Sequence, residues 1–215
     1  MILINYSVVK RLFDIVFALL MLIPLIPVCI IISLLILAES KGGIFYRQER
    51  IGQYLRPFTL YKFRTMFQNS DDNKLTISMR DPRITKTGYF LRKYKLDELP
   101  QIINILSGEM SIVGPRPEVR EHVDLFIDDY EKILTVKPGL TDYASLLFAN
   151  ENQILESFPN PHEAYISYIM PKKIKLNKRY VRDISLYTDL KLIAKTFLKL
   201  FFIKGYYVKM EYFPS

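Results

Sequence analysis

The sequence predicts an α+β protein that is mostly helical, with a single cytosolic domain, an N-terminal re-entrant membrane helix and a small β-hairpin. Three observations lead to this prediction. A long segment near the N-terminus contains no charged side chain, two extended runs flank Gly52, and apolar residues recur at helical spacing over much of the remaining chain. Because 215 residues suffice for one domain and an anchor, we assign residues 1–41 to the membrane helix and 42–215 to the domain.

The uncharged segment covers residues 15–38 and is long enough to cross a bilayer, which takes about 20 helical residues. Pro24 and Pro27 lie near its middle, where a proline removes a backbone hydrogen bond. Basic side chains, which favour the cytosolic side, flank both ends: Lys10, Arg11, Lys41, Arg47, Arg50 and Arg56. This pattern favours a helix that enters the membrane, breaks and returns over the alternative, a single spanning helix. Ser33 is then a candidate to satisfy a carbonyl freed near the break.

The chain is basic, with 30 Lys and Arg against 22 Asp and Glu and a formal net charge of +8. Such a charge suits anionic lipid headgroups or phosphorylated substrates. Nucleic acid is the alternative partner, but the sequence contains no helix-turn-helix, zinc-finger or RNA-binding signature. The single cysteine, Cys29, excludes an internal disulfide and a thiolate metal cluster. We therefore expect a membrane partner and no nucleic acid.

Two extended runs, Ile44–Arg50 and Pro57–Met66, surround Gly52 and predict the hairpin. Alternation with a period of two places Lys62 and Arg64 on one face of the second run. Together these cations can meet a phosphate or a lipid headgroup, and a solvated face of an edge strand explains them equally well.

The next segments lead to a pair of acids. Residues 68–74 are polar and predict a surface loop, and Asp81–Thr85 predicts a turn into a helix that carries Arg92. Asp97 and Glu98, followed by a proline, are typical of a helix start, with Asp97 as the N-cap. The helix would bury an apolar stripe at i, i+3, i+4 and i+7, made by Leu99, Ile102, Ile103 and Leu106, and end at Gly108.

The residues around this helix start suit phosphate chemistry. Two adjacent carboxylates can hold Mg²⁺ when substrate phosphates complete its coordination shell, and a carboxylate can also be a covalent nucleophile. Arg92 and Arg116 can each clamp phosphate oxygens through a guanidinium fork. The alternative is structural: Asp97 only caps the helix and Glu98 only complements its dipole.

Helical patterns return in the C-terminal third. Glu151–Glu156 and Pro161–Met170 predict short helices. Residues 189–204 predict a basic amphipathic helix that lies in the membrane interface, with packing against the protein core as the alternative. Its basic stripe is Lys191, Lys195 and Lys199, and its apolar side is Ile193, Phe197, Leu200 and Phe201. Aromatic anchors follow at Tyr206, Tyr207, Tyr212 and Phe213.

Six motifs occur in one order over roughly residues 10–145: Lys10–Asp14, Pro57–Met66, Asp81–Thr85, Leu96–Gln101, Met110–Pro117 and Lys137–Thr141. With these residues and spacings, the sequence resembles the bacterial sugar transferases, and among them the small monotopic phosphoglycosyl transferases. No single motif is decisive, whereas all of them in this order are specific to the family.

The resemblance implies a reaction and a set of roles. Such enzymes move a phosphosugar from a UDP-sugar to undecaprenyl phosphate, release UMP and so initiate a surface glycan at the cytoplasmic face of the inner membrane. Asp97 resembles the nucleophile that forms a covalent phosphosugar-aspartate, and Glu98 the Mg²⁺ ligand. The family's membrane helix is re-entrant with both ends cytosolic. The residues expected to bind substrate are Lys62, Arg64, Arg92, Arg116, Pro138 and Thr141.

Two positions depart from the family pattern. Ile23 precedes Pro24 where the family commonly has a serine, which leaves the kink of the helix open. Asp142–Ser145 replaces a Gly-Trp-Ala-Gln-like segment near the donor, which leaves donor binding open. A non-catalytic membrane adaptor of a glycan assembly complex is the second functional hypothesis. A homodimer is an open alternative, because Tyr- and Phe-rich surfaces suit a dimer as well as a bilayer.

Overall fold

The computed structural model describes residues 2–68 and 81–201. In chain order the elements are α1 (Ile2–Glu39), β1 (Phe45–Ile51), β2 (Pro57–Phe63), α2 (Lys86–Lys93), α3 (Gln101–Ser107), β3 (Ser111–Val113), α4 (Arg120–Asp124), α5 (Ile127–Ile133), β4 (Gly139–Thr141), α6 (Tyr143–Leu147), α7 (Glu151–Glu156), α8 (Pro161–Ala164), α9 (Met170–Asp183) and α10 (Leu186–Phe201). Short turns are η1 (Gln53–Leu55) and η2 (Leu96–Glu98), both 3₁₀, and η3 (Tyr165–Ile169), a π-helical turn. The mostly helical α+β fold is confirmed.

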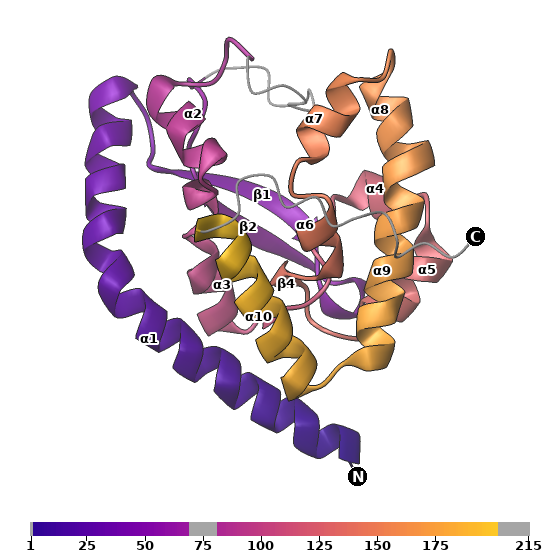
Figure 1. The fold of residues 1–215 in the computed structure, drawn as a ribbon. Coiled ribbons are helices and arrows are strands. Elements are labelled where there is room, and N and C mark those ends of the chain that lie inside the picture. Colours follow the sequence, from indigo (N-terminus) through magenta and orange to yellow (C-terminus); the bar gives the residue numbers. More distant parts are fainter. Residues whose placement is uncertain (1, 69–80, 202–215) are drawn as a thin grey trace.

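The apolar N-terminal helix α1 runs along one side of the domain, and α7, α8 and α9 lie on the opposite side (Figure 1). Among the described residues, α1 is the one helix long and apolar enough to cross a membrane. The ribbon bends, but the helix continues through Pro24 and Pro27, so the expected break is absent. The Ser33 hydroxyl donates to the Cys29 carbonyl at 2.7 Å. The prediction for Ser33 is therefore wrong, because the two prolines free the carbonyls of residues 20 and 23.

The first turns of α1 are fastened to the domain through a buried carboxylate on α10. Asp189 is fully buried and lies 2.7 Å from the Lys10 ammonium. It also accepts hydrogen bonds from the hydroxyls of Tyr6 and Tyr180, at 3.0 and 2.9 Å. Every buried charge in this cluster thus has an opposite charge or a donor beside it, which is the condition under which buried ions are tolerated.

The next turn of α1 is fastened to β3 and α3. The carboxylate of Asp14 accepts hydrogen bonds from the Ser111 hydroxyl at 3.1 Å and from the Ile112 backbone N–H at 3.2 Å. The Arg11 guanidinium donates to the carbonyls of Ile105 and Leu106, at 2.5 and 2.8 Å, and so caps the end of α3. The Lys10–Asp14 motif therefore attaches the apolar helix to the rest of the fold.

The predicted hairpin is confirmed. β1 and β2 pair antiparallel, in a register that runs from Phe45 opposite Phe63 to Ile51 opposite Pro57. β2 ends at Phe63, so Arg64 lies beyond the strand and does not continue the alternation with Lys62. A second, unpredicted sheet joins β3 and β4 in parallel.

Helix α3 begins later than predicted. Residues 96–98 form η2 rather than its first turn, and the N-cap position is Pro100 instead of Asp97. Gly108 ends the helix in the left-handed conformation, with φ of 88°, as the sequence indicates.

The buried face of α3 also differs from the predicted apolar stripe. Ile103 is 46% exposed, whereas Asn104 is fully buried. The Asn104 amide accepts from the Tyr61 backbone N–H at 3.1 Å and donates to the Thr59 carbonyl at 2.7 Å. These bonds join α3 to β2, so a polar side chain faces inward where hydrophobicity alone predicts an apolar one.

Differences also occur in the C-terminal third. α7 matches its predicted bounds, but the helix expected to end at Met170 continues through η3 into α9. On α10 the buried face includes Leu192, while Leu190 and Phe197 are 49% and 55% exposed. The helix therefore packs on the core with one face and presents apolar side chains outward with another. The 69–74 loop, residues 202–204 and the four aromatic anchors lie outside the described residues.

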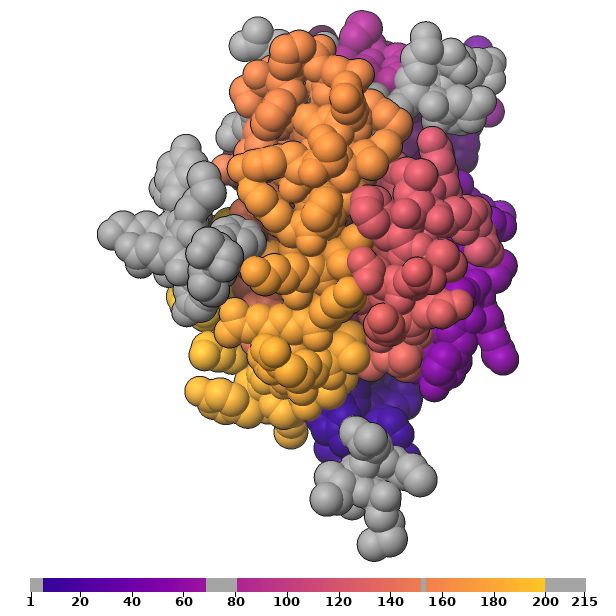
Figure 2. All heavy atoms as spheres, turned by 90° about the vertical axis from the view of Figure 1, so that its right-hand side faces the viewer, coloured from indigo at the N-terminus to yellow at the C-terminus, as the bar shows by residue number. Residues whose placement is uncertain are grey.

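Two larger apolar clusters form the core. One joins α5 to η3 and contains the buried Ile133 and Ile169. The other joins α1, α10 and the segment before β3, and contains Ala18, Met110 and Leu192. Figure 2 shows α8 and α9 in orange beside α4 and α5, with α10 and the start of α1 below them.

We predict that Asp189→Ala lowers the stability of the protein by about 3–5 kcal/mol, because it leaves the buried Lys10 ammonium without its carboxylate. The measurement is the thermal unfolding midpoint in detergent. The control is Asp124→Ala, which removes an exposed carboxylate 3.8 Å from Arg120 and should change the midpoint little. Equal midpoints for both variants would contradict the structural role of Asp189.

Candidate active site

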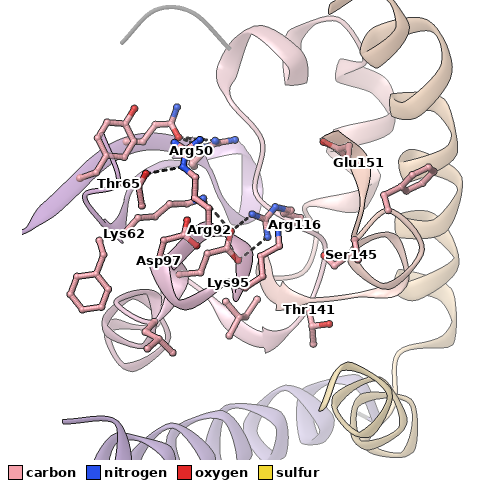
Figure 3. Close-up of a pocket in the computed structure, with 18 of the residues that line it drawn as sticks. Arg50, Lys62, Thr65, Arg92, Lys95, Asp97, Arg116, Thr141, Ser145 and Glu151 are labelled. Atoms are coloured by element: carbon pink, nitrogen blue, oxygen red, sulfur yellow. Dashed lines mark hydrogen bonds and ion pairs between the residues drawn. The ribbon is translucent and has the colours of Figure 1, made fainter. Parts of the chain in front are cut away.

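Asp97 and Glu98 lie on η2, the short turn between α2 and α3 (Figure 3). The preceding residue Lys95 adopts the left-handed conformation, with φ of 59°, which turns the chain sharply after α2. Both carboxylates are only 9% exposed and line a cavity of about 1480 Å³. The sequence correctly predicts that the two acids lie together. In the structure they lie on a 3₁₀ turn rather than on the first turn of α3.

Glu98 is held between two cations. Its carboxylate accepts two hydrogen bonds from the Arg116 guanidinium and lies 3.2 Å from the Lys62 ammonium. Burial alone would raise the pKa of Glu98, but the charges of Arg116 and Lys62 hold it well below its usual value. In turn, the charge of Glu98 raises the pKa of Arg116, whereas burial lowers the pKa of Lys62 despite Glu98.

Asp97 is in the opposite situation. Its Oδ1 is buried and has no hydrogen-bond partner among the described residues. Burial, and then the charge of Glu98, raise the pKa of Asp97 above its usual value, against the opposing charges of Lys62, Lys95 and Arg92. Asp97 is therefore a more basic carboxylate than an ordinary aspartate. Perturbed pKa values of this kind are typical of reactive groups.

Arg92 reaches the cavity from α2. Its Nε donates to the Thr65 hydroxyl at 2.8 Å. Gly88, one turn earlier, allows this approach, because a Cβ there would lie 2.1 Å from the Thr65 carbonyl oxygen. Burial lowers the pKa of Arg92, and the charge of Asp97 opposes that shift.

The loop that carries Arg116 is held by close backbone contacts. A Cβ on Gly139 would lie 2.1 Å from the Gly114 nitrogen, so only glycine fits there. The Gly139 N–H donates to the Pro115 carbonyl at 2.9 Å, and an Arg50 guanidinium nitrogen donates to the Pro117 carbonyl at 3.2 Å. Pairing of β3 with β4 therefore fixes where Arg116 enters the cavity.

The other predicted substrate-binding residues are placed differently. Arg64 donates to the carbonyls of Lys41 and Ser40, at 2.5 and 2.9 Å, just after the end of α1. It therefore holds the backbone there, whereas Lys62 contacts Glu98. The Pro138 carbonyl accepts from the Ser111 N–H at 2.8 Å, which is a structural contact. Thr141 lines the cavity, and its hydroxyl lies 2.6 Å from that of Thr196 on α10.

Four cations line the cavity around the two acids: Lys62, Arg92, Lys95 and Arg116. Lys95 was not among the candidates from sequence, although it directly precedes the Leu96–Gln101 motif that contains Asp97. Ser145 and Glu151 line the cavity from α6 and α7. The resemblance placed the segment that contains Ser145 near the donor, but neither residue was among the candidate site residues. No local pattern marks these two residues, because only the folded chain brings α6 and α7 beside Arg116. The arrangement suits a phosphorylated ligand facing a carboxylate.

The donor set around Glu98 fits a magnesium ion bound together with a substrate. Among the described residues, no group of three or more Asp, Glu, His or Cys side chains gathers to form a complete cage. A carboxylate has about four acceptor sites, and Arg116 and Lys62 occupy three of those on Glu98. One remaining site suits Mg²⁺, which typically takes one or two carboxylates and completes its shell with phosphates and water.

Comparisons with known proteins identify the family of this chain. The family model described as bacterial sugar transferase matches residues 5–203. The chain is 37% identical over 203 residues to the UDP-glucose:undecaprenyl-phosphate glucose-1-phosphate transferase of Escherichia coli K12, covering 92% of this chain and 41% of that protein. It is 33% identical over 198 residues to the uncharacterized sugar transferase EpsL of Bacillus subtilis, covering 92% and 90%.

A third relative is the UDP-N-acetylgalactosamine-undecaprenyl-phosphate N-acetylgalactosaminephosphotransferase of Aeromonas hydrophila, 33% identical over 197 residues, covering 89% of this chain and 43% of that protein. The chain thus spans about two fifths of the length of the Escherichia coli and Aeromonas relatives. The match over nearly the whole chain confirms the resemblance inferred from the motifs, and the chain belongs to the bacterial sugar transferase family.

Proposed function

We propose that this protein transfers a phosphosugar from a UDP-sugar to undecaprenyl phosphate, releasing UMP and forming undecaprenyl-diphosphate-sugar. The observation that carries the proposal is the unequal treatment of two adjacent acids. Glu98 is neutralised by Arg116 and Lys62, while Asp97 keeps an oxygen that has no hydrogen-bond partner among the described residues, in a cavity lined by cations. The names of the relatives support the same class of donor and acceptor. The product would begin an exopolysaccharide, capsule, O-antigen or glycoprotein glycan.

In the first step, a carboxylate oxygen of Asp97 forms a bond to the sugar-side phosphorus of the donor. The bond from that phosphorus to the bridging oxygen breaks, and UMP leaves with the electron pair. Lys62, Arg92 and Arg116 face this position and offset the negative charge of the diphosphate. The raised basicity of Asp97 favours its attack once it is deprotonated.

In the second step, a phosphate oxygen of undecaprenyl phosphate attacks the same phosphorus. The bond to Asp97 breaks, the aspartate is released as a carboxylate, and the lipid diphosphate sugar forms. Glu98 would contribute a ligand to Mg²⁺, and this ion would supply further charge neutralisation at the diphosphate. The Arg116 and Lys62 contacts keep the Glu98 carboxylate ionised and oriented toward that ligand position.

The acceptor is a lipid, so the chemistry needs access to a bilayer. The exposed apolar surface of α1, together with Leu190 and Phe197 on α10, supports membrane contact beside the cavity. We assign α1 to a re-entrant helix with the domain on the cytoplasmic face of the inner membrane. The bend of α1 and its basic flanks support this assignment over a single span. Homodimer formation is a separate proposal that the exposed aromatic side chains permit.

The proposed reaction predicts that Asp97→Asn abolishes UMP release, with a fall of at least about 10³-fold. The fold should be retained, because Asp97 Oδ1 makes no hydrogen bond among the described residues. The measurement is UMP release in nanodiscs with Mg²⁺, undecaprenyl phosphate and a panel of UDP-sugars. Asp128→Asn, on the exposed start of α5, is the control. Substantial turnover by folded Asp97→Asn protein would exclude Asp97 as the nucleophile, and inactivity of the wild type with every sugar would favour the adaptor hypothesis.

Arg116→Lys keeps the positive charge but removes the guanidinium fork that contacts Glu98 twice. We expect kcat/KM for the UDP-sugar to fall about 10²–10³-fold, the usual effect of losing one oriented donor. Arg120→Lys, on the exposed first turn of α4, should leave kcat/KM unchanged. Wild-type kinetics in Arg116→Lys would show that charge alone suffices at this position.

The pH dependence of kcat/KM should report the ionisation of Asp97. Because Asp97 must be deprotonated to attack, activity falls as the pH drops through its pKa, which burial and the charge of Glu98 raise above the usual aspartate value. The charge of Lys95 lowers that pKa, so Lys95→Gln should move the acid limb to higher pH. Lys86→Gln, at the exposed start of α2, should not move it. A shift of the Lys95→Gln limb to lower pH would contradict this assignment.

A further inference from the structure

The cavity continues past Arg116 into a second region, the acidic lobe, whose walls include Glu118, His122, Ser145, Glu151, Tyr165 and Lys173. These residues come from α4, α6, α7, η3, α9 and the segment before α4. Figure 3 shows Ser145 and Glu151 on the other side of Arg116 from Asp97. The reaction steps proposed above use none of these side chains.

Glu118 fixes the wall of the acidic lobe. Its carboxylate accepts hydrogen bonds from the Lys173 ammonium at 2.8 Å and from the Tyr165 hydroxyl at 3.0 Å. Lys173 also donates to the Tyr165 hydroxyl at 2.9 Å. All three side chains are more than 90% buried. Because a satisfied buried network is rigid, this wall is in place before any ligand arrives.

Two other polar groups of the acidic lobe keep hydrogen-bonding capacity. Ser145 Oγ is buried and, within the part of the chain that the structure describes, has no hydrogen-bond partner. Glu151 Oε2 lies 3.3 Å from the Lys173 ammonium; the described residues provide no hydrogen bond to Oε1. The buried Ser145 Oγ carries a desolvation cost that a ligand can remove, and the partly exposed Glu151 carboxylate can exchange water for a ligand hydroxyl.

The charge of the acidic lobe selects the kind of group that fits. Four carboxylates line this end of the cavity, Glu118, Glu121, Glu151 and Glu156. The cations beside them among the described residues are the Lys173 ammonium and the Arg50 guanidinium, which lies 3.7 Å from Glu118, so negative charge predominates. A phosphate would be repelled there and would favour the cations on the other side of Arg116. Hydroxyl groups suit the acidic lobe, because a carboxylate only accepts hydrogen bonds and a hydroxyl can donate them.

The opposite end of the cavity suits a different group. There α1 and α10 contribute apolar side chains, including Phe17, Met21, Ile193 and Phe197. That end matches the hydrocarbon chain of a lipid acceptor. The acidic lobe lies away from α1, so it is the end that a water-soluble part of the donor can occupy without competing with the lipid.

We propose that the acidic lobe binds a hydroxyl-rich ring of the donor, whose hydroxyls donate to the Glu151 carboxylate and bond to Ser145 Oγ. The proposal rests on the proposed function, since it requires a diphosphate donor held at Arg116. Two rings of a UDP-sugar share this chemistry, the ribose and the transferred sugar. Lys173 and Glu118 act as positioning residues that hold Glu151 and the lobe wall.

Binding measurements in an Asp97→Asn background test the proposal without turnover. The ligands are UMP, UDP-glucose and UDP-N-acetylgalactosamine, titrated calorimetrically into the full chain in nanodiscs. Glu151→Gln should weaken binding about ten-fold or more, and Ser145→Ala about three- to ten-fold, since the first loses a hydrogen bond to a charged group. Glu131→Gln, an exposed carboxylate on α5, is the matched control, and unfolding midpoints check the fold of each variant.

The ligands separate the two rings. Weaker binding of UMP in Glu151→Gln and Ser145→Ala places the ribose in the acidic lobe. Unchanged binding of UMP with weaker binding of a UDP-sugar places the transferred sugar there. Unchanged binding of all three ligands by folded variants overturns the proposal while leaving the proposed reaction intact. If the Asp97→Asn reference binds none of them, the assignment of a UDP-sugar donor is wrong and this proposal fails with it.

Discussion

The active site depends on the unequal contacts that nearby cations make with two adjacent carboxylates, Glu98 and Asp97. Arg116 and Lys62 both contact Glu98. For Asp97, burial and the charge of Glu98 outweigh the charges of the surrounding cations, and its pKa rises. One acid is thereby suited to remain an ionised ligand and the other to react. β2 supplies Lys62, and the loop after β3 supplies Arg116, so the hairpin and the small parallel sheet serve the same carboxylate.

Strand β3 also links the loop that carries Arg116 to the apolar helix α1. Asp14 on α1 accepts hydrogen bonds from Ser111 and Ile112, which lie in β3, directly before the loop that carries Arg116. Lys10, one turn earlier, pairs with the buried Asp189 of α10. The position of α1 and the position of Arg116 are therefore fixed by one set of buried contacts, and a lipid acceptor that reaches α1 and α10 lies close to the reacting groups.

Local signals explain what the sequence predicted correctly. Alternation around Gly52 predicted the hairpin, and Gly108 predicted the end of α3, because both depend on neighbouring residues. The buried face of α3 was predicted wrongly, since Asn104 faces inward through bonds to β2. Arg64 was grouped with Lys62 because the strand was expected to continue. The β3–β4 sheet and the acidic lobe lacked a signal, since they join segments far apart in the sequence.

In the proposed reaction, Asp97 becomes covalently attached to the phosphosugar before any acceptor is present. Intact-mass measurement of the purified protein, mixed with Mg²⁺ and a reactive UDP-sugar but no undecaprenyl phosphate, tests it most directly. We expect an added mass equal to one phosphosugar, release of about one UMP per protein, and neither in Asp97→Asn. UMP that appears only after the acceptor is added, with no adduct on active protein, would contradict it and indicate direct transfer.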